Sequence, residues 1–170
     1  MRHALGALPS KVRLIDVGAH EGELFLSLKG RLVEGFGIEP LRDGKLVSGN
    51  FVIAPGFFPA TSPDTQEWDA ITMLAVLEHI PESQHQELAR SCHRFLKPGG
   101  VVVITVPSPV VDHILNVLGK LRLIHGMSLE EHFGFMPRDT TRIFSEPLFR
   151  LVTHRKFQLG LNNLYVFEKR

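Results

Sequence analysis

The sequence predicts an α/β protein in which a doubly wound, mostly parallel sheet of seven strands lies between two layers of helices. Three observations support this prediction. Apolar segments with strand character alternate with turns or with apolar residues at helical spacing. One segment, 100–109 (GVVVITVPSP), is almost continuously apolar, which is typical of a strand buried on both faces. The chain closes with two alternating segments around Gly160, which predict an antiparallel pair at the sheet edge.

The elements follow one another in a regular order. The first five strands are expected at 12–17, 34–40, 50–58, 68–77 and 100–109. Before the fifth, a helix begins near Pro81 and is ended by Lys97, Pro98 and Gly99. A second helix is expected over 110–124, a loop with short helices over 125–147, and the closing strands over 148–158 and 161–170. Because no repeat, low-complexity tract or linker divides the chain, one domain over 1–170 is expected.

Composition excludes several classes of protein. The 19 basic and 18 acidic residues give a formal charge of +1, so no long-range attraction to nucleic acid or to an anionic membrane is expected. The single cysteine, Cys92, excludes an internal disulfide and any metal site with several cysteines, and it suits a reducing compartment. The N-terminal segment MRHALGALPSK is too short and polar for a signal peptide, and no apolar run approaches the roughly 18 residues of a membrane span. A cytoplasmic protein without a membrane span or nucleic-acid partner is therefore expected.

The segment DVGAHEG, residues 16–22, follows the first predicted strand, where doubly wound sheets bind their ligands. A dinucleotide site would show three glycines as G-x-G-x-x-G, whereas this turn has only Gly18 and Gly22. Glu21 and Glu23 add two carboxylates at the start of the next helix, where they would repel a diphosphate at close range. A ligand without a diphosphate therefore fits better, which disfavours a nicotinamide oxidoreductase.

Glu39 ends the second predicted strand, 23 residues after Asp16. A carboxylate at this place can accept hydrogen bonds from both hydroxyls of a ribose, although a solvated acid at a strand end explains Glu39 equally well by itself. An adenosine without a diphosphate is thus a reasonable ligand, and S-adenosylmethionine is such a molecule. Its ammonium suits an acid such as Asp16, and its carboxylate suits free amides of the glycine turn.

Taken in order, these segments resemble the class I S-adenosylmethionine-dependent methyltransferases, specifically the small-molecule enzymes with a minimal core. The segments LIDVGAHEGEL, GIEP, WDAITMLAVLEHIP and LKPGGVVVITVPSP carry the resemblance, which extends over nearly the whole chain. It implies a Rossmann-like fold with three layers and methyl transfer from S-adenosylmethionine, with S-adenosylhomocysteine as the product.

The resemblance also implies a set of cofactor-binding residues at the strand ends. They are Asp16, Gly18, His20, Gly22, Glu39, Pro40, Phe57, Leu74, Ala75 and Val76. Leu74 and Val76 also suit the core. His20 departs from the family pattern because it stands at the usual middle glycine, so its side chain either covers the ligand or points away, with some strain if φ is positive. The third strand lacks the usual acid for the adenine, which leaves Phe57, backbone groups or, more remotely, Asp64 to hold it.

Catalysis and acceptor binding are assigned to the ends of the fourth and fifth strands. In-line transfer from a sulfonium needs alignment of the acceptor more than a catalytic triad, but a hydroxyl acceptor would benefit from a base. His79 and His132 are the candidates, although His79 also suits a helix cap and His132 a surface position. Phe133, Phe135 and Arg138 fit an acceptor pocket, although an aromatic run beside Gly and Pro also suits a loop anchored to the core. No histidine spacing suggests a metal site.

The methyl acceptor is not readable from the sequence. A small molecule is expected, with O-, N- and C-methylation all open. The alternative is a catalytically inactive subunit or regulator that binds S-adenosylmethionine. About a dozen residues precede the first strand, where the family often has helices that cover the substrate. A homodimer contact or a partner subunit is therefore expected to complete an open acceptor site.

Overall fold

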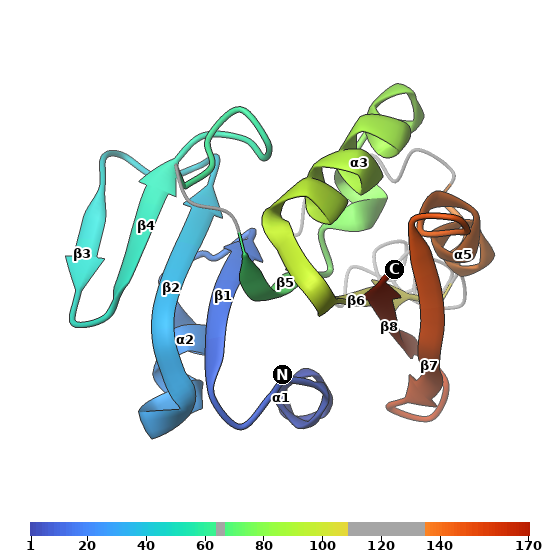
Figure 1. The fold of residues 1–170 in the computed structure, drawn as a ribbon, viewed down its shortest axis with the longest axis horizontal. Helices are drawn as coiled ribbons and strands as arrows, with labels where there is room; N and C mark the ends of the chain where they lie inside the picture. Colours follow the sequence, from blue (N-terminus) through green and yellow to red (C-terminus); the bar gives the residue numbers. More distant parts are fainter. Residues whose placement is uncertain (64–66, 109–134) are drawn as a thin grey trace, which may run out of the picture.

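Eight strands form one mixed sheet in the computed structural model, which describes residues 1–63, 67–108 and 135–170 (Figure 1). The strand order is β3-β4-β2-β1-β5-β6-β8-β7. The strands are β1 (Val12–Val17), β2 (Leu32–Glu39), β3 (Leu46–Ser48), β4 (Phe51–Pro55), β5 (Trp68–Leu74), β6 (Leu96–Pro107), β7 (Phe149–Phe157) and β8 (Asn162–Lys169). The order runs outward from β1 through β2 to β4, and then from β5 through β6 to the closing pair. The predicted doubly wound sheet is confirmed, with its switch point between β1 and β5.

The strand directions also agree with the prediction. β1 pairs in parallel with β2 and β5, β2 with β4, and β5 with β6. β8 lies antiparallel between β6 and β7, which places the closing pair at one edge of the sheet. All five parallel strands therefore present their carboxyl ends at the same edge.

The short strand β3 is an addition to the seven strands expected from the sequence. It pairs antiparallel with β4, where Ser48 lies opposite Phe51. Only Gly49 and Asn50 separate these residues, and Gly49 has a positive φ of 55°. A two-residue loop of this composition is a hairpin signal, which the sequence prediction missed. Because of this hairpin, β3 and not β4 forms the edge of the sheet.

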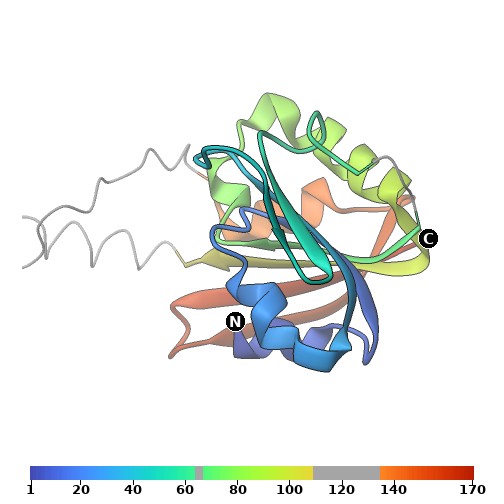
Figure 2. The same ribbon diagram turned by 90° about the vertical axis from the view of Figure 1, so that its left-hand side faces the viewer.

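Helices cover both faces of the sheet (Figure 2). The helices are α1 (Arg2–Ala7), α2 (Glu23–Leu28), α3 (His85–Phe95) and α5 (Thr140–Ile143), with 3₁₀ turns η1 (Lys29–Arg31), η2 (Leu77–His79), η3 (Glu82–Gln84) and η4 (Pro137–Asp139). Residues of α1 and α2 pack in one apolar cluster, and residues of α3 with the segment after α5 pack in another on the opposite face. The three layers are thus confirmed, whereas the helix expected over 110–124 lies outside the described residues. No helix in the described part of the chain is long and apolar enough to cross a membrane.

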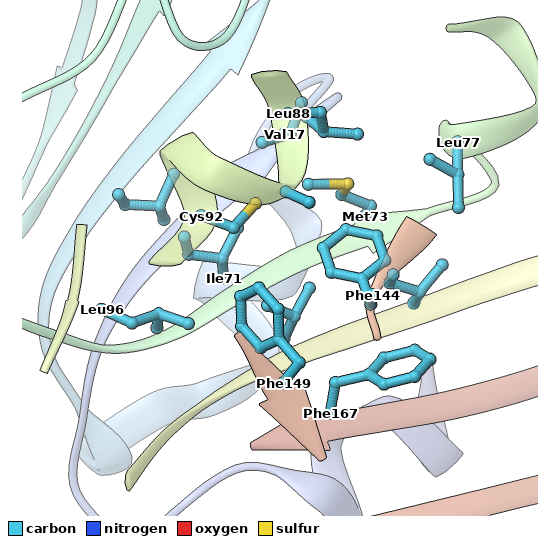
Figure 3. Packing of buried hydrophobic residues seen from close by; sticks show 14 of the residues in the cluster. Val17, Ile71, Met73, Leu77, Leu88, Cys92, Leu96, Phe144, Phe149 and Phe167 are labelled. Carbon is cyan, nitrogen blue, oxygen red and sulfur yellow. The ribbon is translucent and has the colours of Figure 1, made fainter. Parts of the chain in front are cut away.

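The apolar core between α3 and the sheet holds the strands whose carboxyl ends form one edge of the sheet. Leu88 and Cys92 of α3 face Ile71 and Met73 of β5, and aromatic rings near the closing strands continue the cluster (Figure 3). Each large apolar side chain buried there contributes roughly 1.5–3 kcal/mol relative to an exposed one. Cys92 is fully buried in this core, and this burial raises the pKa of its thiol.

Candidate functional site

A cavity of about 530 Å³ opens at the switch point of the sheet. Its walls come from the ends of β1, β2, β4 and β5 and from the turns before α3. The lining residues are Val17, Gly18, Ile38, Pro40, Gly56, Phe57, Phe58, Val76, His79, Ile80, Pro81 and Gln84. Five of the predicted site residues are brought together here, namely Gly18, Pro40, Phe57, Val76 and His79.

Gly18 forms the wall of the cavity next to β1. Its φ of 76° is costly for a residue with a Cβ atom, and a Cβ placed there would lie 2.5 Å from Val76 Cγ2. The amides of Gly18 and Ala19 donate to the carbonyl oxygen of Ile38 at 2.8 and 3.1 Å, which ties the turn to β2. Glycine at this position therefore lets the turn approach the chain that follows β5.

The rest of the turn is bonded within the protein. Gly22, with a φ of 87°, precedes α2 and donates its amide to the Ala19 carbonyl at 2.8 Å. The His20 amide donates to Glu39 Oε2 at 2.9 Å. The sequence argument assigned free turn amides to a ligand carboxylate, but the amides of Gly18, Ala19, His20 and Gly22 all have protein acceptors.

The His20 side chain points away from the cavity. The side chain is 75% exposed, and Nδ1 lies 3.0 Å from Glu23 Oε1. The hydrogen bond to Glu23 raises the pKa of the imidazole. His20 has a φ of 46°, so the expected positive φ is present. The contribution of His20 to the site is thus its amide, which holds Glu39.

Glu39 joins the glycine turn to the chain after β2. Its Oε2 accepts from the His20 amide, and its Oε1 accepts from the Leu41 amide at 3.1 Å. A carboxylate offers about four acceptor positions, so each oxygen keeps a lone pair for another donor. The half-buried Glu39 is therefore oriented in advance and can accept further hydrogen bonds from a pair of hydroxyls.

The acids at the start of α2 are less repulsive than the sequence suggests. Arg42 Nη1 lies 3.2 Å from both carboxylate oxygens of Glu21. Glu23 pairs with His20. Glu21 would therefore repel a diphosphate less than the sequence suggests. The missing third glycine is the stronger evidence against a dinucleotide ligand.

Asp16 lies in the sheet beneath the turn and does not line the cavity. It is 4% exposed, and Thr72 Oγ1 donates to its Oδ1 at 2.5 Å. Burial raises the pKa of this carboxyl to about 7, against the lowering effect of the Thr72 hydrogen bond. Near neutral pH, Asp16 is therefore poised between its neutral and ionised forms.

The chain after β5 turns sharply at Ala75, which has a φ of 57°. Its amide donates to the Thr105 carbonyl at 3.0 Å and lies 3.1 Å from Thr105 Oγ1. This turn aims Val76 and His79 at the cavity, whereas Leu74 and Ala75 do not line it.

The wall opposite Gly18 is apolar. Phe57 is 70% exposed at its rim, and the Phe58 ring packs on Phe95 of α3 with ring centres 5.8 Å apart. Gln84, at the end of η3, adds a polar group. The sequence reasoning missed Phe58 and Gln84, although the neighbouring Phe57 and the LEHIP segment pointed to this region. Asp64 lies outside the described residues.

Among the other predicted residues that the structure describes, Gly22, Glu39, Phe135 and Arg138 do not line this cavity, although Glu39 stands between the lining residues Ile38 and Pro40. Phe135 lines a neighbouring one of about 350 Å³ between α3 and α5, which shares Ile80 with the first. Arg138 lines a third, of about 390 Å³, near the end of β6. His132 and Phe133 lie outside the described residues. Within the described ranges, no group of three or more His, Cys, Asp or Glu side chains is placed to hold a metal ion.

Known proteins are similar to this chain in sequence and in fold. A family model described as a methyltransferase domain matches residues 2–146. The ubiquinone biosynthesis O-methyltransferase of Pseudomonas syringae pv. tomato is 32% identical over 137 residues, which is 75% of this chain and 55% of that protein. The chain spans about half the length of the curated relatives it matches.

Two solved structures show the same fold at low identity. An S-adenosylmethionine-dependent methyltransferase from Mesorhizobium loti has a TM-score of 0.74 at 11% identity, covering 99% of this chain and 96% of that one. A chain in the complex of the Haloferax volcanii Trm112 methyltransferase activator with a methyltransferase has a TM-score of 0.73 at 14% identity, covering 99% and 88%. Together with the matched family model, they confirm the resemblance drawn from the sequence: this chain belongs to the methyltransferase domain family, whose class I members use S-adenosylmethionine as the methyl donor.

Proposed function

We propose that residues 1–170 form one domain that transfers a methyl group from S-adenosylmethionine to a small-molecule acceptor. The observation that carries this proposal is the cavity of about 530 Å³ at the switch point, bounded by Gly18 on one side and by Pro40 and Phe57 on the other. Its size falls within the range of small-ligand pockets, and switch points are where doubly wound sheets bind ligands.

The residues around the cavity fit the parts of this cofactor. Glu39 holds the ribose through acceptor positions that the His20 and Leu41 amides leave unused. The apolar wall at Phe57 and Phe58 suits an adenine ring, with Gln84 near its polar edge. The methionine chain lies beside Gly18 and Val76, which both line the cavity and pack against each other.

Bound there, S-adenosylmethionine supplies an electrophilic methyl group on a sulfonium sulfur. The protein aligns an acceptor atom in line with the methyl carbon–sulfur bond. As the acceptor bonds to the carbon and loses its proton, the carbon–sulfur bond breaks and S-adenosylhomocysteine leaves. His79 lines the cavity after β5, so we assign it to receive this proton. A positioned base contributes roughly 10²–10⁴-fold to such a step. Among O-, N- and C-methylation, we favour a hydroxyl acceptor because the curated relative is named an O-methyltransferase.

We also propose that a second chain completes the acceptor side of the site. The structural neighbour in a complex with a methyltransferase activator supports this arrangement.

Methyl transfer itself can be measured without knowing the natural acceptor. The protein is incubated with methyl-labelled S-adenosylmethionine and a panel of small molecules whose acceptor atom is a hydroxyl oxygen, an amine nitrogen or an acidic carbon. Half of the molecules in each class carry a carboxylate or phosphate. We expect labelled product from hydroxyl acceptors, and we expect His79→Gln to lower turnover by roughly 10²-fold or more with cofactor affinity intact. Cofactor binding without transfer to any acceptor would favour the inactive subunit or regulator instead.

Replacement of His20 tests whether its ring takes part in chemistry. Because the ring is exposed and points to Glu23, His20→Gly is expected to bind S-adenosylhomocysteine as well as the wild type does, and to relieve roughly 1 kcal/mol of left-handed backbone strain. His20→Ala is the matched control, since it removes the ring but keeps the strain. Calorimetric titration and turnover are measured for both variants. Intact binding with a large loss of turnover in both would give His20 a catalytic role.

A further inference from the structure

The third cavity, of about 390 Å³, has basic and polar walls. It lies between η4–α5 and the strand ends of β6, β7 and β8. Arg138 comes from η4, His154 and Lys156 from β7, Ser108 follows β6, and Asn163 belongs to β8. Residues that are far apart in the sequence, from Ser108 to Asn163, thus line one cavity.

The two residues with a formal charge that line this cavity, Arg138 and Lys156, are both basic. Arg138, His154 and Lys156 line it, and no acidic residue of the described part of the chain does. Within that same part, neither Arg138 nor Lys156 makes an ion pair, whereas the nearby Arg142 pairs with Asp139 at 3.4 Å. Two exposed cations that face one cavity without a counter-ion repel each other unless an anion enters between them.

The floor of the cavity is a fixed polar network. His154 Nε2 lies 3.1 Å from Asn163 Oδ1, Asn163 Nδ2 donates to Ser108 Oγ at 3.2 Å, and Ser108 donates to the Gly160 carbonyl at 2.6 Å. These bonds run in one direction, so His154 donates from Nε2. Its ring stacks on Tyr165 with centres 4.2 Å apart and planes within 5°. Asn163 is 2% exposed, and the network therefore holds the His154 imidazole in one orientation at the floor of the cavity.

This basic cavity lies on the same side of the sheet as the cofactor cavity. Tyr165 belongs to the apolar cluster that faces α3, as do Val17 and Ile38 of the cofactor cavity. Both cavities open at the carboxyl ends of the parallel strands. From β5 to β8 the sheet crosses two strand spacings, which is about 10 Å. This separation is within the length of a small molecule that carries an anionic group at one end.

We propose that the basic cavity binds the anionic group of the methyl acceptor, an oxyanion such as a carboxylate or a phosphate. This inference rests on the proposed function and adds the chemical class of the acceptor. Arg138 and Lys156 neutralise the oxyanion from opposite walls, and His154 and the Tyr165 ring form the floor beneath the carbon skeleton. The reacting atom then lies about 10 Å away, over the end of β5.

Tyr165 is the only tyrosine of the chain, so selective labelling gives a single ring resonance that reports from the cavity floor. Phenyl phosphate, benzoate and the neutral phenol are titrated against the full chain without cofactor. We expect at least one of the two anions to shift the resonance to saturation, and phenol to leave it unchanged at the same concentration. The tighter of the two anions identifies the oxyanion as phosphate or carboxylate.

Two charge-removing variants and a matched control give the decisive comparison. Arg138→Gln and Lys156→Gln are each expected to weaken anion binding at least tenfold. Arg155→Gln should leave it unchanged, because Arg155 precedes Lys156 on β7 but pairs with Leu164, whose side chain belongs to the opposite face. Equal shifts by phenol, no shift by either anion, or equal weakening by Arg155→Gln would overturn the inference. Titration of S-adenosylhomocysteine into the same proteins tests the proposed function separately. If the wild-type protein did not bind S-adenosylhomocysteine, the proposed function alone would be contradicted.

Discussion

Glu39→Ala is expected to weaken S-adenosylhomocysteine binding by on the order of 1.5–3 kcal/mol, which is more than tenfold in Kd. The substitution removes the acceptor of the ribose hydroxyls. It also frees the His20 and Leu41 amides, which Glu39 holds at 2.9 and 3.1 Å, so the glycine turn loses its bond to Glu39 and keeps those to the Ile38 carbonyl of β2. Isothermal titration calorimetry at fixed pH and salt measures the change.

Two further variants separate these contributions. Glu39→Gln keeps one acceptor oxygen and should lose less affinity than Glu39→Ala. Glu34→Ala, on the same strand, removes an exposed carboxylate that pairs with Arg13 at 2.9 Å and should leave affinity unchanged. A folded Glu39→Ala protein with wild-type affinity would remove Glu39 from the cofactor site.

Asp16→Asn is expected to change how stability depends on pH. Burial raises the pKa of Asp16 from 3.8 to about 7, so the folded state disfavours the ionised carboxylate. Well below pH 4 the Asp16 carboxyl is protonated in both the folded and the unfolded protein, so it does not make the free energy of unfolding depend on pH there. As the pH rises from about 4 to 7, the unfolded chain ionises first and the free energy of unfolding falls; above about pH 7 the full loss is present.

The asparagine variant lacks this loss and can still accept the Thr72 hydrogen bond. Its stability relative to the wild type should therefore rise by roughly 2–3 kcal/mol between pH 5 and pH 8, measured by urea unfolding at each pH. Thr72→Val is the complementary variant, because removing the Thr72 hydroxyl that donates to Asp16 raises the pKa further and enlarges the pH effect. Parallel pH profiles for wild type and Asp16→Asn would show that Asp16 is ionised in the folded protein across this range.

The fold could be predicted where the hydrophobic pattern of a segment and the strand pairing of a doubly wound sheet indicate the same strand. The run over 100–109 and the alternation around Gly160 each specify a strand whose neighbours follow from doubly wound topology, and both are present as β6 and the β7–β8 pair. β3 was missed because three residues are too few for a periodic signal. Its only mark is the Gly49–Asn50 loop, which is meaningful once Ser48 and Phe51 are known to pair.

The site was predictable where it lies at strand ends. Gly18 directly follows a predicted strand, Pro40 and Val76 lie in the last two residues of two others, and all three line one cavity. The contacts that decide charge were not predictable in this way. Arg42 reaches back to Glu21 across the end of β2, and the closing hairpin brings Lys156 to the cavity that Arg138 also lines. Neither arrangement has a signal in sequence spacing.

The central claim is that the cavity between the ends of β1 and β5 binds the adenosine of S-adenosylmethionine. A crystal structure of the chain with S-adenosylhomocysteine tests it most directly. We expect ordered adenosine between Gly18 and Phe57, with both ribose hydroxyls within hydrogen-bonding distance of the Glu39 carboxylate. An ordered adenosine elsewhere on the chain, or a ribose with no contact to Glu39, would contradict it.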